Sequence, residues 1–220
     1  MRALPAPVLL WIAALCGFIV LAAFASVYDR FPADLWLVRR FQDVDSSTFA
    51  RTLDWAADAA GGWGQLVVVP VGAVCLLLAR RWLEGPLLLV APAAGILHTA
   101  IKEIVGRPRP SHELVQWSAS PHTPSFPSGH ADSAVVIYGL IFYFITVFVR
   151  QPVLRLVGQA ICLWVILFTG MQRVYTGVHW PSDVLGGYYL GGLLLAALIA
   201  LHRRLRPAPA AVTGDPRPRY

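Results

Sequence analysis

The chain has 220 residues, of which 57% are hydrophobic and only 14% charged, with a formal net charge of +6 and a mean hydropathy of +0.60. Soluble domains average about 45–50% apolar and about 25% charged residues, so the composition excludes an ordinary soluble domain and predicts a surface that largely faces lipid. The positive charge does not indicate nucleic-acid binding, because the basic residues are not gathered into one soluble patch.

Six apolar stretches predict membrane-spanning helices. In chain order they are residues 8–27, 64–79, 86–101, 131–149, 153–169 and 184–201. A span needs about 20 mainly apolar residues, with a range near 17–25, so the second and third stretches are expected to extend into their flanks. Continuous runs of this length favour helices over a barrel. We therefore predict an all-α integral membrane bundle of six spans, forming one domain over residues 1–206.

The segments outside these stretches are simpler. Arg2 precedes the first stretch and Ala23-Phe24-Ala25 resembles a small-residue cleavage site, so a cleaved signal peptide is the alternative to a first span. Residues 28–62 mix aromatic and charged side chains and predict one or two short interfacial helices, the second capped by Asp45 or Ser46. The Pro- and Ala-rich tail, residues 207–220, is predicted to be disordered.

Arginines distinguish the two sides of the predicted bundle. If all six stretches span, Arg80 and Arg81, residues 150–155 and the arginines of residues 203–206 share one side with Arg2. Loops rich in Lys and Arg stay in the cytoplasm. The segments 28–62, 103–129 and 170–183 then lie outside. A short chain with a cytoplasmic arginine tail favours a bacterial inner-membrane protein whose outer loops face the periplasm.

The outer segments contain three polar clusters, and the first follows the third span. Lys102, Arg107 and Arg109 can together bind one phosphate, or they can form a snorkelling helix end that binds lipid headgroups. The prolines after both arginines favour an extended backbone.

The second cluster, Ser128-Gly129-His130, stands directly before the fourth span. Free backbone N–H groups and the helix dipole favour an anion at a helix N-terminus. The alternative is a simple helix cap with an interfacial histidine.

The third cluster is Arg173, His179 and Asp183. His179 and Asp183 are spaced i, i+4 and can share a helix face. A carboxylate that bonds one ring nitrogen fixes the tautomer and leaves the other nitrogen free as a nucleophile. The alternative is a polar helix start at the interface.

Together the clusters supply cations, a backbone anion site and two histidines, which is what phosphoryl transfer without a metal requires. Three cysteines scattered in apolar runs give no metal-ligand spacing. We therefore expect no metal and no cofactor.

Read in order, the clusters are Lys, six residues, Arg-Pro; Pro-Ser-Gly-His; and Arg, five residues, His, three residues, Asp. This pattern resembles the type-2 phosphatidic acid phosphatase superfamily, which contains lipid phosphate phosphatases and vanadium haloperoxidases. One departure is Gln172, where the family often has Ser; a Gln side chain can still donate to a phosphate. Arg107 falls on no motif position and is left as a possible headgroup contact.

The resemblance implies a role for each matching residue. His179 would be the nucleophile that forms a phosphohistidine, Asp183 would orient it, and His130 would protonate the leaving oxygen and then activate water. The phosphate oxygens would be held by Lys102, Arg109, Ser128, Gly129 and Arg173.

The expected function is metal-independent hydrolysis of a phosphate ester or diphosphate of a membrane lipid. Candidate substrates are phosphatidic acid, phosphatidylglycerol phosphate and undecaprenyl diphosphate, and no nucleic-acid or obligate protein partner is expected. A phosphotransferase, a vanadate-dependent halide oxidase and a non-catalytic binder of anionic lipid are the alternatives. His98, one turn before Lys102, either lines the same site or is a buried, satisfied histidine; His112 and His122 are candidates for the entrance.

Overall fold

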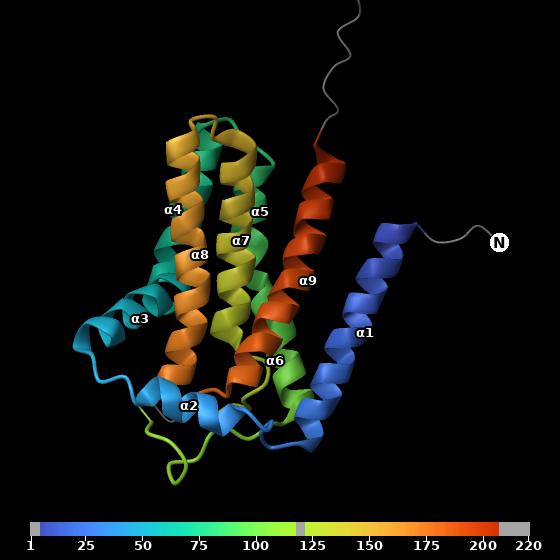
Figure 1. Cartoon of the computed structure of the whole chain (residues 1–220). Helices are drawn as coiled ribbons and strands as arrows, with labels where there is room; N and C mark the ends of the chain where they lie inside the picture. Colours follow the sequence, from blue (N-terminus) through green and yellow to red (C-terminus); the bar gives the residue numbers. More distant parts are fainter. Residues whose placement is uncertain (1–4, 118–121, 207–220) are drawn as a thin grey trace, which may run out of the picture.

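The computed structural model describes residues 5–117 and 122–206, apart from the side chains of Trp63 and Ala94. Within these residues all regular elements are helical: α1 (Ala6–Val27), α2 (Asp34–Gln42), α3 (Ser47–Ala60), α4 (Gly62–Leu78), α5 (Glu84–Val90), the 3₁₀ turn η1 (Ala91–Ala93), α6 (Ala94–Val105), α7 (Gly129–Phe148), α8 (Pro152–Tyr175) and α9 (Pro181–Leu205). Figure 1 shows a bundle with α1 on its flank, where α1 contacts α6 and α9. The tail predicted to be disordered, residues 207–220, lies outside the described residues.

The predicted all-α membrane bundle is confirmed. Five helical segments are long and apolar enough to cross a membrane: α1, α7, α8, α9 and the segment Glu84–Val105, which joins α5, η1 and α6. Pro92 lies in η1, where its missing N–H interrupts the α-helical ladder. The sixth span is reached when α3 and α4 are taken as one span, bent by 54° at their junction. The second and third predicted stretches therefore extend into their flanks, as expected.

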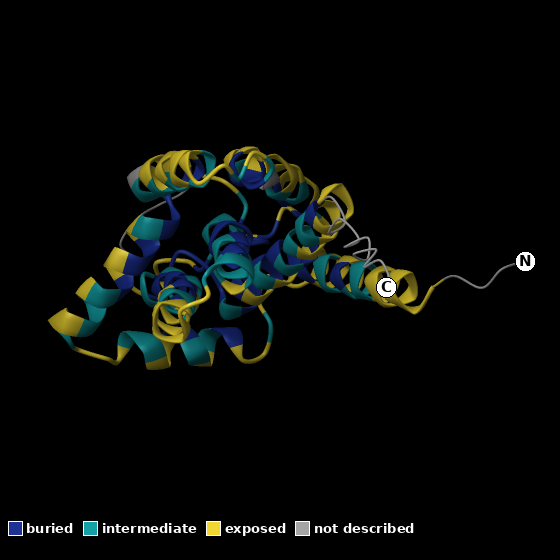
Figure 2. Ribbon diagram, turned by 90° about the horizontal axis from the view of Figure 1, so that it is seen from above, coloured by how far each residue is buried: buried dark blue, intermediate teal, exposed yellow. Residues whose placement is uncertain are grey.

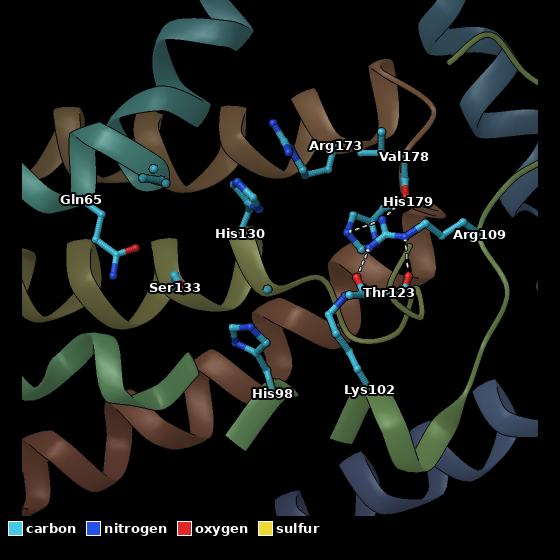
Figure 3. Close-up of a pocket in the computed structure, with 14 residues that line it drawn as sticks. Gln65, His98, Lys102, Arg109, Thr123, His130, Ser133, Arg173, Val178 and His179 are labelled. Atoms are coloured by element: carbon cyan, nitrogen blue, oxygen red, sulfur yellow. Dashed lines mark hydrogen bonds between the residues drawn. The ribbon is translucent and has the colours of Figure 1, made fainter. Parts of the chain in front are cut away.

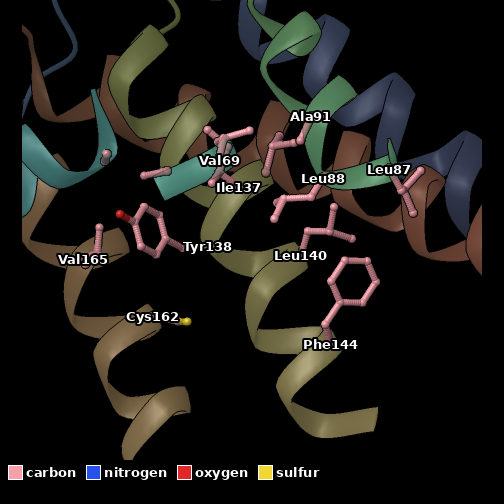
Figure 4. Packing of buried hydrophobic residues seen from close by; sticks show 13 residues of the cluster. Val69, Leu87, Leu88, Ala91, Ile137, Tyr138, Leu140, Phe144, Cys162 and Val165 are labelled. Carbon is pink, nitrogen blue, oxygen red and sulfur yellow. The ribbon is translucent and has the colours of Figure 1, made fainter. Parts of the chain in front are cut away.

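Helix α7 is the centre of the bundle. It packs mainly on α8 and α9 and also contacts α3, α5 and α6. Figure 4 shows part of the apolar core around it, with Ile137, Leu140 and Phe144 facing Leu88 of α5. Figure 2 shows exposed residues concentrated on the outward faces of the helices, and these include large apolar side chains such as Ile104, which is 82% exposed. Such faces suit contact with lipid.

Glycines let α9 approach α7 closely. A Cβ atom at Gly187 would lie 2.4 Å from the carbonyl oxygen of Ser128, and one at Gly191 would lie 2.8 Å from that of Asp132. Both contacts are with backbone, which cannot move aside cheaply. This close approach holds the start of α7 against α9.

The arginine-rich turns meet at one end of the bundle. The ring of Phe148, the last residue of α7, lies under the guanidinium of Arg81 at 4.0 Å and under that of Arg206 at 5.5 Å. The turn before α5 and the end of α9 are thus adjacent, in agreement with the predicted layout. Helix α2 crosses the opposite end (Figure 1).

Residues 28–62 form two helices, as predicted, and Ser46 caps the second by accepting a hydrogen bond from the Phe49 N–H at 3.3 Å. Helix α3 also packs one face inside the bundle, which the expectation of interfacial helices did not include. Leu53 and Ala56 are fully buried, and the Thr169 hydroxyl of α8 donates to the Ala56 carbonyl at 3.0 Å. The small alanine face of α3 allows this close packing.

A buried ion network at the α2 end ties three segments together. Arg107, 1% exposed, donates to the Asp183 carboxylate of α9 at 2.6 Å and to the Asp34 carboxylate of α2 at 3.1 Å. Its guanidinium also lies 4.7 Å from the Phe31 ring. The suggestion that Arg107 contacts lipid headgroups is therefore wrong, because two buried carboxylates and an aromatic ring enclose it.

Replacing Arg107 should destabilise the whole fold. Arg107→Met leaves Asp34 and Asp183 buried without their cation, and breaking a buried ion pair in this way costs about 3–5 kcal/mol. Thermal unfolding in detergent would measure the loss. The matched control is Arg51→Met, at an exposed arginine of α3. Equal stability of the Arg107→Met and Arg51→Met proteins would contradict this account.

Candidate active site

The three clusters that the sequence singles out meet around one pocket of about 370 Å³ at the α2 end of the bundle (Figure 3). Six of the eight predicted site residues line it: Lys102, Arg109, Gly129, His130, Arg173 and His179. Asp183 and Ser128 lie directly behind this lining. Helices α6, α7 and α8 and the loops before α7 and α9 each contribute to the pocket, so residues more than 70 positions apart in the chain become neighbours.

Helix α8 ends at Tyr175, and a tight turn then brings His179 back toward Arg173. Gly177 has a φ of +69°, and a Cβ there would lie 2.2 Å from the Gln116 carbonyl oxygen. Only glycine fits this turn. The His179 N–H then donates to the Arg173 carbonyl at 3.2 Å, which fixes the spacing between the cation and the imidazole.

His179 and Asp183 form the predicted pair. The His179 Nδ1 atom lies 3.5 Å from Asp183 Oδ2. The same carboxylate oxygen accepts from the Trp180 N–H at 2.8 Å and from the Ser125 hydroxyl. The Asp183 carboxylate is fully buried, so its position is set by these donors and by Arg107.

The other ring nitrogen of His179 faces the pocket. Arg109 Nη1 lies 3.1 Å from His179 Nε2. Because a guanidinium can only donate, Nε2 acts as the acceptor and the hydrogen belongs on Nδ1, toward Asp183. Burial lowers the pKa of His179 to about 4, partly opposed by the hydrogen bond and charge of Asp183. The imidazole is therefore neutral near pH 7, with a lone pair directed at the cations of the pocket.

Three cations surround this lone pair. Arg109 is held by the carbonyls of Thr123 at 2.8 Å and Val178 at 2.6 Å. Burial lowers its pKa, opposed by Asp183, yet a guanidinium remains charged in proteins. Lys102 donates to the Pro124 carbonyl at 2.8 Å, while the buried Arg173 Nε has no hydrogen-bond partner in the described part of the chain. These groups have donors available for an anion.

The N-terminus of α7 points into the same space. Ser128 is its N-cap but makes no side-chain capping bond, and the first N–H groups of a helix have no partner within it. Gly129 and His130 begin the helix and line the pocket. Ser128 itself does not line it: its N–H donates to the Asp183 carbonyl at 2.9 Å, and its buried hydroxyl has no partner among the described residues.

The structure adds a residue that the sequence patterns did not identify. Ser125, three positions before Ser128, donates to Asp183 and lies 3.4 Å from His179 Nδ1. His98, expected from its spacing either to line the site or to be a buried, satisfied histidine, lines the pocket and pairs with Asp132 at 2.9 Å. The His112 ring lies tilted against that of Trp117, with ring centroids 3.8 Å apart, and neither His112 nor His122 lines this pocket.

Gln172 requires a correction. Its amide donates to the Asp54 carboxylate at 2.9 Å and the residue is absent from the pocket lining. The suggestion that it donates to a phosphate is therefore wrong, because the side chain turns toward α3. Gln172 instead connects α8 to α3.

The arrangement suits an anion that undergoes substitution at phosphorus. A neutral histidine with a fixed tautomer supplies a nucleophile, and preorganised cations and helix N–H groups supply the charge stabilisation that phosphoryl transfer depends on. A second imidazole, His130, lies across the pocket from His179 (Figure 3). Within residues 5–117 and 122–206, no group of three His, Cys, Asp or Glu side chains is placed to hold a metal ion.

Known proteins are similar to this chain in sequence and in fold. Phosphatidylglycerophosphatase B of Bacillus subtilis is 34% identical over 134 residues, which cover 58% of this chain and 62% of that protein. Lipid A 1-phosphatase of Rhizobium etli is 32% identical over 54% of this chain and 50% of its own length. The chain thus spans about half to three fifths of these two relatives. Decaprenylphosphoryl-5-phosphoribose phosphatase of Mycobacterium tuberculosis is 32% identical over 64% of this chain and 72% of its own length.

A crystal structure of a transmembrane PAP2 type phosphatidylglycerolphosphate phosphatase from Bacillus subtilis superposes with a TM-score of 0.76. It covers 89% of this chain and 97% of that one at 23% identity, and so supports the fold alone. The family model of the PAP2 superfamily matches residues 84–207, a segment that contains every predicted site residue. Because this match extends over more than half of the sequence, the chain belongs to the PAP2 superfamily.

Proposed function

We propose that this protein is a metal-independent phosphatase that hydrolyses a phosphate ester or diphosphate of a membrane lipid. The observation that carries the proposal is the geometry of His179. Its Nδ1 faces the buried Asp183 carboxylate, and its Nε2 lies at 3.1 Å from a cation in a pocket lined by two more. The lipid phosphatases named among the relatives support the same reaction class.

The reaction consists of two in-line displacements. His179 Nε2 attacks phosphorus, the bond between phosphorus and the lipid oxygen breaks, and His130 gives its proton to that oxygen. Water then attacks the phosphohistidine, His130 takes a proton from the water, and inorganic phosphate leaves with His179 restored. Arg109, which contacts His179 Nε2, moves from this nitrogen to the phosphate oxygens.

The cations take the part that metal ions play in other phosphatases. Lys102, Arg109 and Arg173, together with the N–H group of Gly129, bind the phosphate oxygens, whereas the covered Ser128 does not line the pocket and is left out of this set. We place this site at the outer, periplasmic face of a bacterial inner membrane, since the arginine-rich turns lie at the opposite end of the bundle. Residues 1–206 act as one membrane domain, and the lipid chain of the substrate stays in the bilayer. Undecaprenyl diphosphate, phosphatidic acid and phosphatidylglycerol phosphate are the candidate substrates.

The defining experiment is phosphate release by the purified protein in detergent with EDTA present. We expect turnover of at least one lipid in a panel of phosphatidic acid, phosphatidylglycerol phosphate and undecaprenyl diphosphate, with a soluble phosphomonoester as reference. Chelation should not slow the reaction because the cations are side chains. Activity lost in EDTA and restored by a divalent metal would contradict the mechanism, and product formed only with an added acceptor would indicate a phosphotransferase.

His179→Ala should lower kcat by at least about 10³-fold, since residues that act together in covalent catalysis lose most of their effect when one is removed. The wild-type protein should carry phosphate on His179 when it is quenched during turnover under alkaline conditions, which preserve phosphohistidine. His112→Ala, in the outer loop away from the pocket, is the control and should keep its rate. A His179→Ala protein that keeps most of its activity would refute the assignment of His179 as the nucleophile.

The protonation of His179 offers an independent test. Since its pKa lies near 4, the imidazole should stay neutral as pH falls from 7 to 5 and should protonate only below that range. Asp183→Asn removes a nearby negative charge and should lower the pKa of His179 further; Arg109→Gln removes a positive charge and should raise it. NMR of the histidine rings measures the titration midpoint of His179 in the wild-type protein and in both variants. The His179 signal is assigned by its loss in His179→Ala. A wild-type midpoint near 6.5, or shifts of the opposite sign, would overturn the geometry described.

A further inference from the structure

A second histidine–carboxylate pair lines the pocket outside the three motif clusters. His98 Nδ1 of α6 lies 2.9 Å from Asp132 Oδ2 of α7. The Asp132 carboxylate is fully buried and its Oδ1 has no hydrogen-bond partner among the described residues. The His98 side chain retains 17% exposure and faces the pocket. The pair is thus anchored in protein on one side and open to a ligand on the other.

The pair belongs to a second polar layer of the same pocket. His98 precedes Lys102 by four residues on α6, Ser133 follows His130 by three on α7, and Gln65 enters from α4. Three or four residues make about one helical turn, or ~5 Å, so this layer lies one turn further into the bundle than the phosphate-binding cations. In Figure 3, Ser133 and Gln65 lie on the side of His130 away from His179, and His98 faces His130 across the pocket.

This position is where the leaving group of the proposed reaction must go. In an in-line displacement the departing oxygen lies opposite the attacking His179 nitrogen. His130 stands between His179 and the layer of Ser133 and Gln65, where it can protonate the departing oxygen. Whatever remains on the lipid therefore occupies the layer of His98, Ser133 and Gln65. An apolar lining there would suit a bare alkyl chain, whereas this lining is polar and contains a histidine with a buried carboxylate behind it.

The orientation of His98 defines what it can bind. Asp132 occupies Nδ1, and a Cβ placed on Gly129 would lie 2.6 Å from His98 Nε2, so Nε2 lies against the start of α7, beside the phosphate layer. An imidazole that carries its hydrogen on Nε2 donates to an anion from that nitrogen while Nδ1 stays with Asp132. Such a ring can bond Asp132 through Nδ1 and a second anion through Nε2.

We propose that His98, positioned by Asp132, binds the phosphate that stays on the lipid, so that the site selects lipid diphosphates over lipid monophosphates. This inference rests on the proposed function and narrows its substrate class. During turnover the terminal phosphorus is transferred to His179, the bond from this phosphorus to the bridging oxygen breaks, and the lipid monophosphate leaves with a proton from His130. His98 holds that monophosphate group throughout the transfer.

The test compares two substrates that share one chain, farnesyl diphosphate and farnesyl monophosphate, in detergent with EDTA. The wild-type protein should have the higher kcat/KM for the diphosphate. His98→Ala should reduce the ratio of the two kcat/KM values by about ten- to a hundredfold, the effect of losing one hydrogen bond to a charged group. His98→Gln, which keeps a side-chain N–H donor, should fall between. His112→Ala is the matched control and should leave the ratio unchanged.

If His98→Ala lowers kcat/KM equally for both substrates, or leaves the ratio of the two values unchanged, the inference is overturned. The His98–Asp132 pair would then serve only to connect α6 to α7. A wild-type preference for the monophosphate would overturn it too, while leaving the phosphatase proposal intact.

Binding of pyrophosphate and phosphate, measured by thermal stability, tests the second anion site separately from the proposed phosphatase reaction. Pyrophosphate should raise the thermal stability of the wild-type protein more than inorganic phosphate does, and His98→Ala should remove this difference. If no lipid is hydrolysed but the pyrophosphate effect depends on His98, the phosphatase proposal fails and the second anion site stands. If pyrophosphate and phosphate act alike on the wild-type protein, the second site is refuted.

Discussion

The structure depends on a buried negative charge at Asp183. An ionised carboxylate in a dry interior costs several kcal/mol unless it is paired and hydrogen-bonded, and here Arg107, Ser125, the Trp180 N–H and His179 all converge on it. Arg107 in turn requires Asp34 on its other side. Helix α2, the loop between α6 and α7 and the start of α9 must therefore meet at one point. The same requirement that closes this end of the bundle also sets the tautomer of His179.

The pocket lies where a helical membrane bundle best accommodates polar chemistry. Helix N-termini carry unsatisfied N–H groups, and the start of α7 is left uncapped by any side chain. Cations from α6 and α8 reach the same level because their helices end there. One turn further in, His98 and Asp132 are still polar but face the bundle interior, which is the usual place for ionisable groups at membrane depth. The cations that bind phosphate thus lie at the helix ends, and His98 and Asp132 lie about one turn of helix deeper in the bundle.

The errors in the sequence-based expectations share a physical origin. Arg107 and Gln172 stand next to motif residues, yet both side chains turn away from the pocket, toward carboxylates on α2 and α3. Asp34 and Asp54 lie in a segment whose sequence pattern indicated only interfacial helices. Ser125 has no spacing that marks it, since it acts through the loop that carries it back to Asp183. Each of these contacts joins residues separated by more than 50 positions, and no local pattern records such a pairing.

The sequence by itself determined the helical membrane class, the approximate spans and the separation of arginine-rich from motif-bearing ends. It also identified eight candidate site residues, six of which line the pocket. These depend on hydropathy, on the length of a span and on the spacing of residues within one helix or turn, which are local properties. Only the tertiary structure decided which groups stand behind Asp183, that Ser128 is covered while Gly129 is open, and that His98 meets Asp132. Those outcomes depend on how α6, α7 and α9 approach one another, because a side chain acquires its partner only when the helices that carry both are packed.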